Sequence, residues 1–218
     1  MLQRSGRVIK LNNIMQIVLK KLTKKFNKQI IFSNLDFVFE ANQSYAITGY
    51  NGSGKSTLIQ IIYNYNTFSN GEINYYLNNN LIEENTQTHM AFASPYLELP
   101  EELTLQEVID FHFNIKSKRS ELDLNQLITE SNLFEHKHKL IKNFSSGMKQ
   151  RAKLILAFAT QCNLLLLDEP CSNFDEAGII WYKKCIQIIN NKCTIIVASN
   201  QLYEYEFCKN VLDITNFK

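Results

Sequence analysis

Short apolar segments alternate along this chain with longer amphipathic ones. Segments in which every position or every second position is apolar, as in β-strands, occupy residues 16–19, 35–39, 44–48, 73–77, 164–167 and 194–198. Segments with the 3.6-residue period of helices occupy about residues 58–65, 104–115, 123–134, 147–160 and 177–190. Fully apolar strands that alternate with helices predict an α/β fold with a mostly parallel sheet, and the first strands predict an additional antiparallel part.

The interval from about residue 96 to 143 contains no strong strand pattern and is expected to be a helical insertion. Thr104 and Glu107 have the spacing of a capping box, which predicts a helix that begins there and buries Val108, Phe111 and Ile115. A run of three asparagines at residues 78–80 between two apolar segments predicts a hairpin. We therefore expect one domain at residues 15–218 with this helical subdomain inserted, and a short appendage at residues 1–14.

The composition excludes several classes of protein. Hydrophobic residues make up 45% of the 218 residues and charged residues 20%, which is ordinary globular usage. The net charge of +2 does not point to a polyanion, so no nucleic acid partner is expected. No apolar run reaches the 18 residues of a membrane-spanning helix, and no secretory leader is recognisable. Five cysteines without C-x-x-C spacing indicate a reducing, cytoplasmic compartment.

A glycine-rich loop between a predicted strand and a predicted helix carries the strongest chemical signal. It matches the P-loop pattern G-x-x-x-x-G-K-[ST], and its residues are Gly49, Tyr50, Asn51, Gly52, Ser53, Gly54, Lys55, Ser56 and Thr57. Glycines let consecutive backbone N–H groups face an anion at the positive end of the helix. Lys55 would lie between the β- and γ-phosphates, Ser56 would bind Mg²⁺ and Thr57 would contact the α-phosphate. A P-loop NTPase core is therefore expected.

Two carboxylates follow the apolar strand at residues 164–167. Because neighbouring side chains of a strand point to opposite faces, Asp168 and Glu169 are expected to serve different purposes. Asp168 offers a hard oxygen ligand for Mg²⁺, with Ser56 as the second metal ligand. Glu169 would polarise the attacking water.

Residues 144–151, Phe-Ser-Ser-Gly-Met-Lys-Gln-Arg, resemble the signature motif of ATP-binding cassette (ABC) ATPases, which is usually Leu-Ser-Gly-Gly-Gln. This chain keeps the serine, Ser145, and the second glycine, Gly147, and changes the other three positions. Taken alone, the segment would be interpreted as a capped amphipathic helix with a basic face formed by Lys149, Arg151 and Lys153. Its order and spacing relative to the other motifs favour the signature instead.

The resemblance covers residues 15 to 218 and implies a function. Members of this family bind ATP and Mg²⁺ and hydrolyse ATP between two copies that face each other head to tail, which drives a separate membrane permease from its cytoplasmic side. By this resemblance Phe26 would stack on adenine, Asp175 would couple the two nucleotide sites, and Ser145 and Gly147 would close on the γ-phosphate held by the second copy. The helical subdomain would contact the permease.

Two family positions are filled differently here. Ser94 stands where the family has a glutamine that reaches Mg²⁺ and water, and Asn200 stands where it has a histidine on the γ-phosphate. A serine reaches less far, and an asparagine carries no proton or positive charge. Since one lost transition-state hydrogen bond costs about 2.7–4 kcal/mol, slow Mg²⁺-dependent hydrolysis is expected, with Glu169, Ser94 and Asn200 as the catalytic residues.

Two questions stay open at the level of sequence. The substitutions at Ser94 and Asn200 favour an alternative function, a nucleotide-dependent regulatory or assembly module with little turnover. An apolar stretch formed by Tyr96, Leu97, Leu99 and Leu103 is expected to be either a docking surface or part of the core.

Overall fold

The computed structural model describes residues 14–218, so nearly all of the expected appendage at residues 1–14 lies outside the described part. The strands are β1 (Met15–Phe26), β2 (Gln29–Phe39), β3 (Ser44–Thr48), β4 (Asn70–Leu77), β5 (Asn80–Ile82), β6 (Met90–Ala93), β7 (Leu164–Asp168), β8 (Thr194–Ala198) and β9 (Asn210–Asp213). The helices are α1 (Lys55–Ile62), α2 (Leu105–Ile115), α3 (Leu124–Glu130), α4 (Ser146–Ala159), α5 (Glu176–Ile189) and α6 (Leu202–Tyr205). Short 3₁₀ turns are η1 (Thr86–His89), η2 (Phe134–His136), η3 (Ile141–Asn143) and η4 (Ile214–Phe217).

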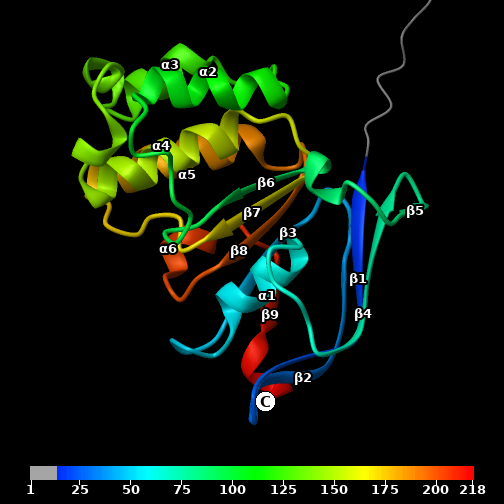
Figure 1. The fold of residues 1–218 in the computed structure, drawn as a ribbon. Coiled ribbons are helices and arrows are strands. Elements are labelled where there is room, and N and C mark those ends of the chain that lie inside the picture. Colours follow the sequence, from blue (N-terminus) through cyan, green and yellow to red (C-terminus); the bar gives the residue numbers. More distant parts are fainter. Residues whose placement is uncertain (1–13) are drawn as a thin grey trace, which may run out of the picture.

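Two sheets form the framework of the molecule (Figure 1). A parallel sheet has the strand order β6-β7-β8-β3-β9, and an antiparallel sheet has the order β2-β1-β4-β5. The α/β fold with a mostly parallel sheet and an antiparallel part is therefore confirmed. The carboxyl ends of β3, β6, β7 and β8 lie at one edge of the parallel sheet, where a ligand site is expected in such folds.

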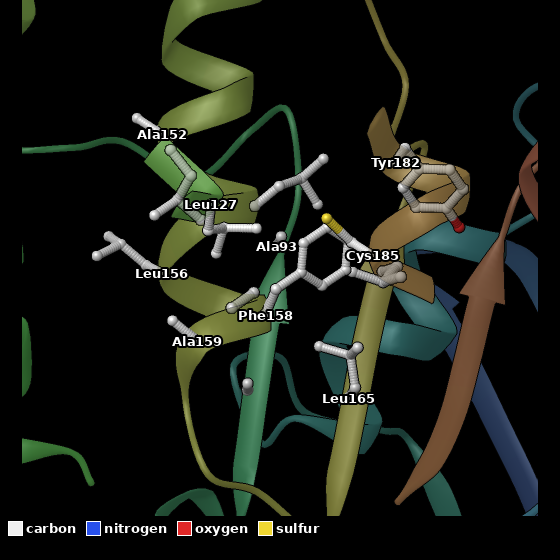
Figure 2. Close-up of a cluster of buried hydrophobic side chains, with 14 of the residues drawn as sticks. Ala93, Leu127, Ala152, Leu156, Phe158, Ala159, Leu165, Tyr182 and Cys185 are labelled. Atoms are coloured by element: carbon white, nitrogen blue, oxygen red, sulfur yellow. The ribbon is translucent and has the colours of Figure 1, made fainter. Parts of the chain in front are cut away.

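The central strand β7 contributes to two hydrophobic cores because its alternate side chains point to opposite faces. Leu165 and Leu167 pack in the core formed with the helices α2 to α5, whereas Leu164 and Leu166 pack in the core formed with α1 and the antiparallel sheet. In the first core, Phe158 of α4 lies against side chains of α5 (Figure 2). The layers visible in Figure 1 follow from this, with α4 and α5 on one face of the parallel sheet and α1 on the other.

Most of the predicted elements are present, and some details differ. The capping box at Thr104 and Glu107 exists and α2 begins there, but only Val108 of the three expected core residues is buried. Phe111 and Ile115 are 60% and 70% exposed, because α2 turns the face with Leu105, Val108 and Ile109 towards α4. Helix α1 ends at Ile62, so Tyr65 is exposed as well. Strand β9 has no counterpart among the sequence predictions.

The chain between β6 and α4 contains α2, α3, η2 and η3 and no strand, as expected for the inserted helical subdomain. Leu99 and Leu103 pack partly buried against the core, whereas Tyr96 is 69% exposed, so the apolar stretch is divided between core and surface. The boundaries 96 and 143 stay a prediction. Within residues 14–218, every helix is too short or too polar to cross a membrane.

Candidate nucleotide and metal site

The glycine-rich loop connects the carboxyl end of β3 to α1 and has backbone angles that only glycine adopts easily. Gly54 precedes α1 with a φ of 109°, and a Cβ atom there would lie 2.6 Å from Cγ2 of Ile31. Because glycine caps α1, no side chain occupies its first N–H groups. The N-termini of four other helices each receive a side-chain cap, from Thr104, Asp123, Ser145 and Asp175. The open terminus of α1 suits an anion.

Lys55 is the cation of this loop and is almost completely buried. Its Nζ donates to the carbonyl oxygens of Gly49 at 2.8 Å and Tyr50 at 3.4 Å. Burial lowers the pKa of Lys55, while the charges of Glu169 and Asp168 oppose this shift. The hydroxyl of Ser53, within the loop, is fully buried without a hydrogen-bond partner. The loop thus brings several hydrogen-bond donors together. The ammonium of Lys55 is hydrogen-bonded to neutral carbonyl oxygens.

Asp168, at the end of β7, is fully buried, and each of its carboxyl oxygens accepts a hydrogen bond from a serine. Ser56 Oγ donates to Oδ1 at 2.9 Å, and Ser94 Oγ donates to Oδ2 at 3.1 Å. Burial raises the pKa of Asp168 to about 6, because these hydroxyls and Lys55 only partly compensate for the lost hydration. Three oxygen groups meet here from three parts of the chain, and hard oxygen donors are what Mg²⁺ prefers.

This donor set fits an ion that keeps part of its coordination for water and substrate. Within residues 14–218, no group of three or more His, Cys, Asp or Glu side chains is placed to hold a metal. One carboxylate with neighbouring hydroxyls matches the way Mg²⁺ is held beside phosphates.

Glu169 follows Asp168 and faces a different environment. Twelve non-glycine residues among 14–218 have positive φ, and ten of them are asparagines; Glu169, with a φ of 41°, is one of the two others. Its N–H donates to the carbonyl oxygen of Ala198 at 2.9 Å, which holds the turn in place. Glu169 lines a cavity of about 460 Å³ together with Asn51, Lys55, Ser56 and two of the three loop glycines. Asp168 is buried against two serines and Glu169 lines the cavity, and their separate roles stay a prediction.

Asn200, after β8, reaches the phosphate loop. Its side-chain amide donates to the side-chain oxygen of Asn51 at 2.7 Å. A second cavity, of about 310 Å³, is lined by Asn51, Glu169 and Asn200 along with the loops after β7 and β8. Glu169 and Asn51 line both cavities, so the two hollows share a wall at the position where the reacting groups are expected.

Phe26 is placed apart from this cavity. It lies at the β1–β2 turn, is 47% exposed, and has the ammonium of Lys24 at 4.4 Å from its ring centre. Phe26 is therefore not a core residue. Ile31 and Tyr96 line the cavity and Phe26 does not, so stacking of Phe26 on adenine stays a prediction.

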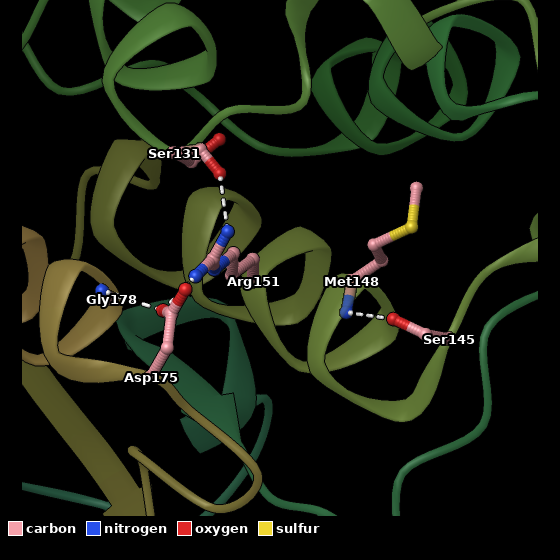
Figure 3. A network of polar contacts seen from close by, with 6 residues as sticks. All are labelled: Ser131, Ser145, Met148, Arg151, Asp175 and Gly178. Carbon is pink, nitrogen blue, oxygen red and sulfur yellow. Dashed lines mark hydrogen bonds and ion pairs between the residues drawn. The ribbon is translucent and has the colours of Figure 1, made fainter.

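Ser145, Gly147 and Asp175 form a separate group that does not line the phosphate-loop cavity. Ser145 caps α4 by accepting from the N–H of Met148 at 3.2 Å, and Asp175 caps α5 by accepting from the N–H of Gly178 at 2.9 Å (Figure 3). Arg151 forms an ion pair with Asp175 and donates to the carbonyl oxygen of Ser131 (Figure 3). Within one chain Ser145 and Asp175 stabilise helix termini.

The basic helix face considered for α4 is wrong in the structure. Lys153 is only 7% exposed, and the side chain of Arg151 is mostly covered and paired with Asp175. Lys149 is partly exposed and forms an ion pair with Glu101. Sequence reasoning also missed Glu204, whose buried carboxylate accepts from the N–H of Cys171 at 2.6 Å and from the hydroxyl of Ser199. A lysine between apolar residues in the stretch Ala152–Ala159 was the available signal for Lys153; none existed for Glu204.

The comparisons with known proteins agree with this geometry. The profile of the family described as ABC transporter matches residues 32–172. The chain is 28% identical to the ABC transporter ATP-binding protein YcbN of Bacillus subtilis, over 85% of this chain and 61% of that protein. It is 30% identical to the cytochrome c biogenesis ATP-binding export protein CcmA of Idiomarina loihiensis, over 79% of this chain and 80% of that protein. The chain thus spans less than two thirds of the length of YcbN.

A solved ATP-binding subunit of an ABC transporter superposes with a TM-score of 0.77 at 23% identity, over 91% of this chain and 85% of that one. At 23% identity the superposition shows only that the two chains share a fold. The family profile, by contrast, covers well over half of the chain and includes the phosphate loop, the segment with Ser145 and the acidic pair. The chain therefore belongs to the ABC transporter family of ATP-binding proteins.

Proposed function

We propose that this chain binds ATP with Mg²⁺ and hydrolyses it slowly, as the ATPase subunit that powers transport through a separate membrane permease. The observation that carries the proposal is the hydrogen bond of 2.9 Å between Ser56 Oγ and Asp168 Oδ1. It joins the phosphate loop to the acidic pair at the edge of the cavity that Lys55 and Glu169 line. A loop for phosphates, an oxygen ligand set and a carboxylate facing the same hollow support phosphoryl transfer to water.

Each residue then has a defined task in the proposed reaction. Lys55 and the open N-terminus of α1 bind the β- and γ-phosphates, and Ser56 with Asp168 holds Mg²⁺, which when bound supplies positive charge to the phosphate oxygens. Glu169 orients the attacking water and accepts its proton. Asn200 and Ser94 supply neutral hydrogen-bonding groups. Because neither can add positive charge to the transition state, turnover is slow.

The second half of the site would come from another copy of the chain. Ser145 and Gly147 lie at the N-terminus of α4 and do not line the phosphate-loop cavity of their own chain, which supports a contact with a phosphate on a partner. Head-to-tail pairing would bring them over the cavity of the second copy, with Asp175 between the two sites. ATP therefore closes the pair, and hydrolysis with release of products opens it.

The transport role is supported by the names of the relatives. YcbN is named an uncharacterized ABC transporter ATP-binding protein, and CcmA is named a cytochrome c biogenesis ATP-binding export protein. With such a role the chain would lie on the cytoplasmic face of the membrane, attached to its permease through the helical subdomain at residues 96–143. No nucleic acid takes part.

The test is retention of radiolabelled ATP by the purified chain with Mg²⁺, followed by turnover and size measurements on Glu169→Gln. We expect the wild-type chain to bind ATP and Lys55→Ala to lose that binding. Glu169→Gln is expected to lower turnover at least about 100-fold and to accumulate an ATP-bound dimer, visible by light scattering. A chain that binds no nucleotide, or a Glu169→Gln variant with unchanged turnover, would overturn the proposal.

A second function is favoured by the hydrogen bond between Asn200 and Asn51, two neutral side chains at the place where charge is needed. In this second function, the chain is a nucleotide-dependent switch of a regulatory or assembly complex and hydrolyses almost no ATP. Coexpression with a candidate membrane partner distinguishes the two, since a transport subunit gains ATPase activity in the complex and a switch does not.

A further inference from the structure

Lys153 is a buried lysine whose task is not explained by the proposed site residues. It lies on α4, is 7% exposed, and its Nζ donates to the carbonyl oxygens of Ser94 at 2.8 Å and Pro95 at 2.9 Å. These two carbonyls belong to the loop that follows β6. An ammonium that binds two consecutive carbonyls holds that stretch of backbone in one position, because charged donors make the strongest hydrogen bonds.

The loop that Lys153 holds carries the Ser94 hydroxyl. Ser94 Oγ donates to Asp168 Oδ2 at 3.1 Å and accepts from the N–H of Tyr96 at 3.3 Å. The other oxygen of Asp168 binds Ser56 of the phosphate loop. A continuous chain of hydrogen bonds therefore runs from α4 through Ser94 to the carboxylate that is expected to hold Mg²⁺.

Burial of Lys153 is costly for the fold. Within residues 14–218, no carboxylate forms an ion pair with Lys153. Burial together with the charge of Lys149 lowers the pKa of Lys153 to about 8. An aliphatic side chain would fill the same place without this desolvation cost. The contacts to Ser94 and Pro95 are what a lysine adds.

We propose that Lys153 is a positioning residue of the metal site, which acts through Ser94 by fixing the loop that aims the Ser94 hydroxyl at Asp168. The inference rests on the proposed function. The contact with Lys153 would explain how this chain uses a serine at the position next to Mg²⁺. Because the backbone of Ser94 is held close to Asp168, the short side chain of Ser94 is long enough to reach it. Residues that orient metal ligands in this way typically contribute 10- to 100-fold to metal affinity.

The experiment measures the affinity of the full chain for a fluorescent non-hydrolysable ATP analogue twice, with excess Mg²⁺ and with EDTA. The ratio of the two affinities reports the contribution of the metal. We expect Lys153→Met to lower this ratio about tenfold while the affinity in EDTA stays unchanged, which also shows that the variant is folded. Lys153→Arg, which keeps the charge, should restore part of the ratio, and Lys153→Gln, which can bind one carbonyl, should give an intermediate value.

Two further variants separate positioning from packing. Ser94→Ala should lower the ratio as much as Lys153→Met, and the double variant should lower it no further, because both act on one hydrogen bond. The matched control is Lys149→Met, one turn earlier on α4, which removes an ion pair with Glu101 and should leave the ratio unchanged.

The outcomes discriminate between the two proposals. If the wild-type ratio is high and Lys153→Met keeps it, or if the effects of Lys153→Met and Ser94→Ala multiply, the positioning role is refuted and the proposed function stands. If the wild-type chain binds the analogue under neither condition, the proposed function itself is refuted, and the inference with it.

Discussion

The side-chain amide of Asn200 donates a hydrogen bond of 2.7 Å to the side-chain oxygen of Asn51. Asn51 belongs to the phosphate loop, and Asn200 follows β8 on the same edge of the parallel sheet. Asn200, 149 residues after Asn51 in the chain, is thus held against the phosphate loop by a hydrogen bond between two uncharged side chains. This arrangement predicts that Asn200 limits the rate of hydrolysis and leaves binding intact.

Asn200→His is expected to raise turnover about tenfold or more, because an imidazole at this position can carry a proton and positive charge towards the γ-phosphate. The affinity for ATP should change little. Steady-state ATPase kinetics over a range of ATP concentrations measure both quantities. Asn200→Ala, which removes the bond to Asn51 and adds no charge, is the control and should not accelerate the reaction. Equal rates for the wild-type chain and Asn200→His would show that this position does not limit hydrolysis.

Asp168 makes the stability of the metal-free protein depend on pH. Burial raises the pKa of Asp168 from 3.8 to about 6, so the folded chain holds more protons than the unfolded chain between these pH values. The free energy of unfolding without Mg²⁺ should therefore fall as the pH rises from about 4 to 6. Urea unfolding at several pH values measures this slope. In Asp168→Asn the slope should be smaller, though not zero, because burial also raises the pKa of Glu204. If Asp168→Asn leaves the pH dependence of the free energy of unfolding unchanged, the raised pKa of Asp168 is contradicted.

Glu204 is expected to stabilise the two loops that carry Glu169 and Asn200. Its carboxylate accepts from the N–H of Cys171 and from the Ser199 hydroxyl, and its side chain is buried. Glu204→Gln replaces one acceptor oxygen by a donor, which leaves a buried partner unsatisfied and should cost about 1–3 kcal/mol of stability.

Chemical denaturation tests this prediction, with Glu206→Gln as the matched control. Glu206 lies two residues further on in a partly exposed ion pair with Lys183, so its loss should change the stability by less than about 1 kcal/mol. Equal effects of the two substitutions would mean that the buried carboxylate does not hold the loops.

Phe158 is expected to be the most sensitive position among the aromatic residues of the helical core. It is fully buried, and its ring centre lies 5.9 Å from that of Trp181 and 6.1 Å from that of Tyr182. Figure 2 shows Phe158 and Tyr182 in this core. Phe158→Ala should lower the free energy of unfolding by about 3–5 kcal/mol. Phe111→Ala, at a 60% exposed position of α2, should change it by about 0.5 kcal/mol or less. Thermal or urea unfolding compares the two, and similar losses would contradict the packing described here.

Local patterns were sufficient for much of the architecture. The apolar run at residues 164–167 predicted a strand that is apolar on both faces, and the structure divides its leucines between two cores. The capping box at Thr104 predicted the start of α2. Hydrophobic period, capping and glycine-rich turns act over a few residues, so they can be recognised without knowledge of the fold. The same holds for the phosphate loop, whose chemistry lies within nine consecutive residues.

Contacts between distant segments were decided only by the tertiary structure. The helical period of α2 predicted that Phe111 and Ile115 are buried. The packing of α2 on α4 determines which side of the helix is covered, and both residues are exposed. Taken alone, the sequence of α4 predicted that Lys153 belongs to a solvated basic face. The structure places the loop after β6 against α4, and Lys153 binds two carbonyl oxygens of that loop. The sequence by itself determined which residues have the chemistry for phosphate and metal. Which of them meet was determined by the order of the parallel strands, because strand order brings Ser56, Ser94 and Asp168 together from three distant segments.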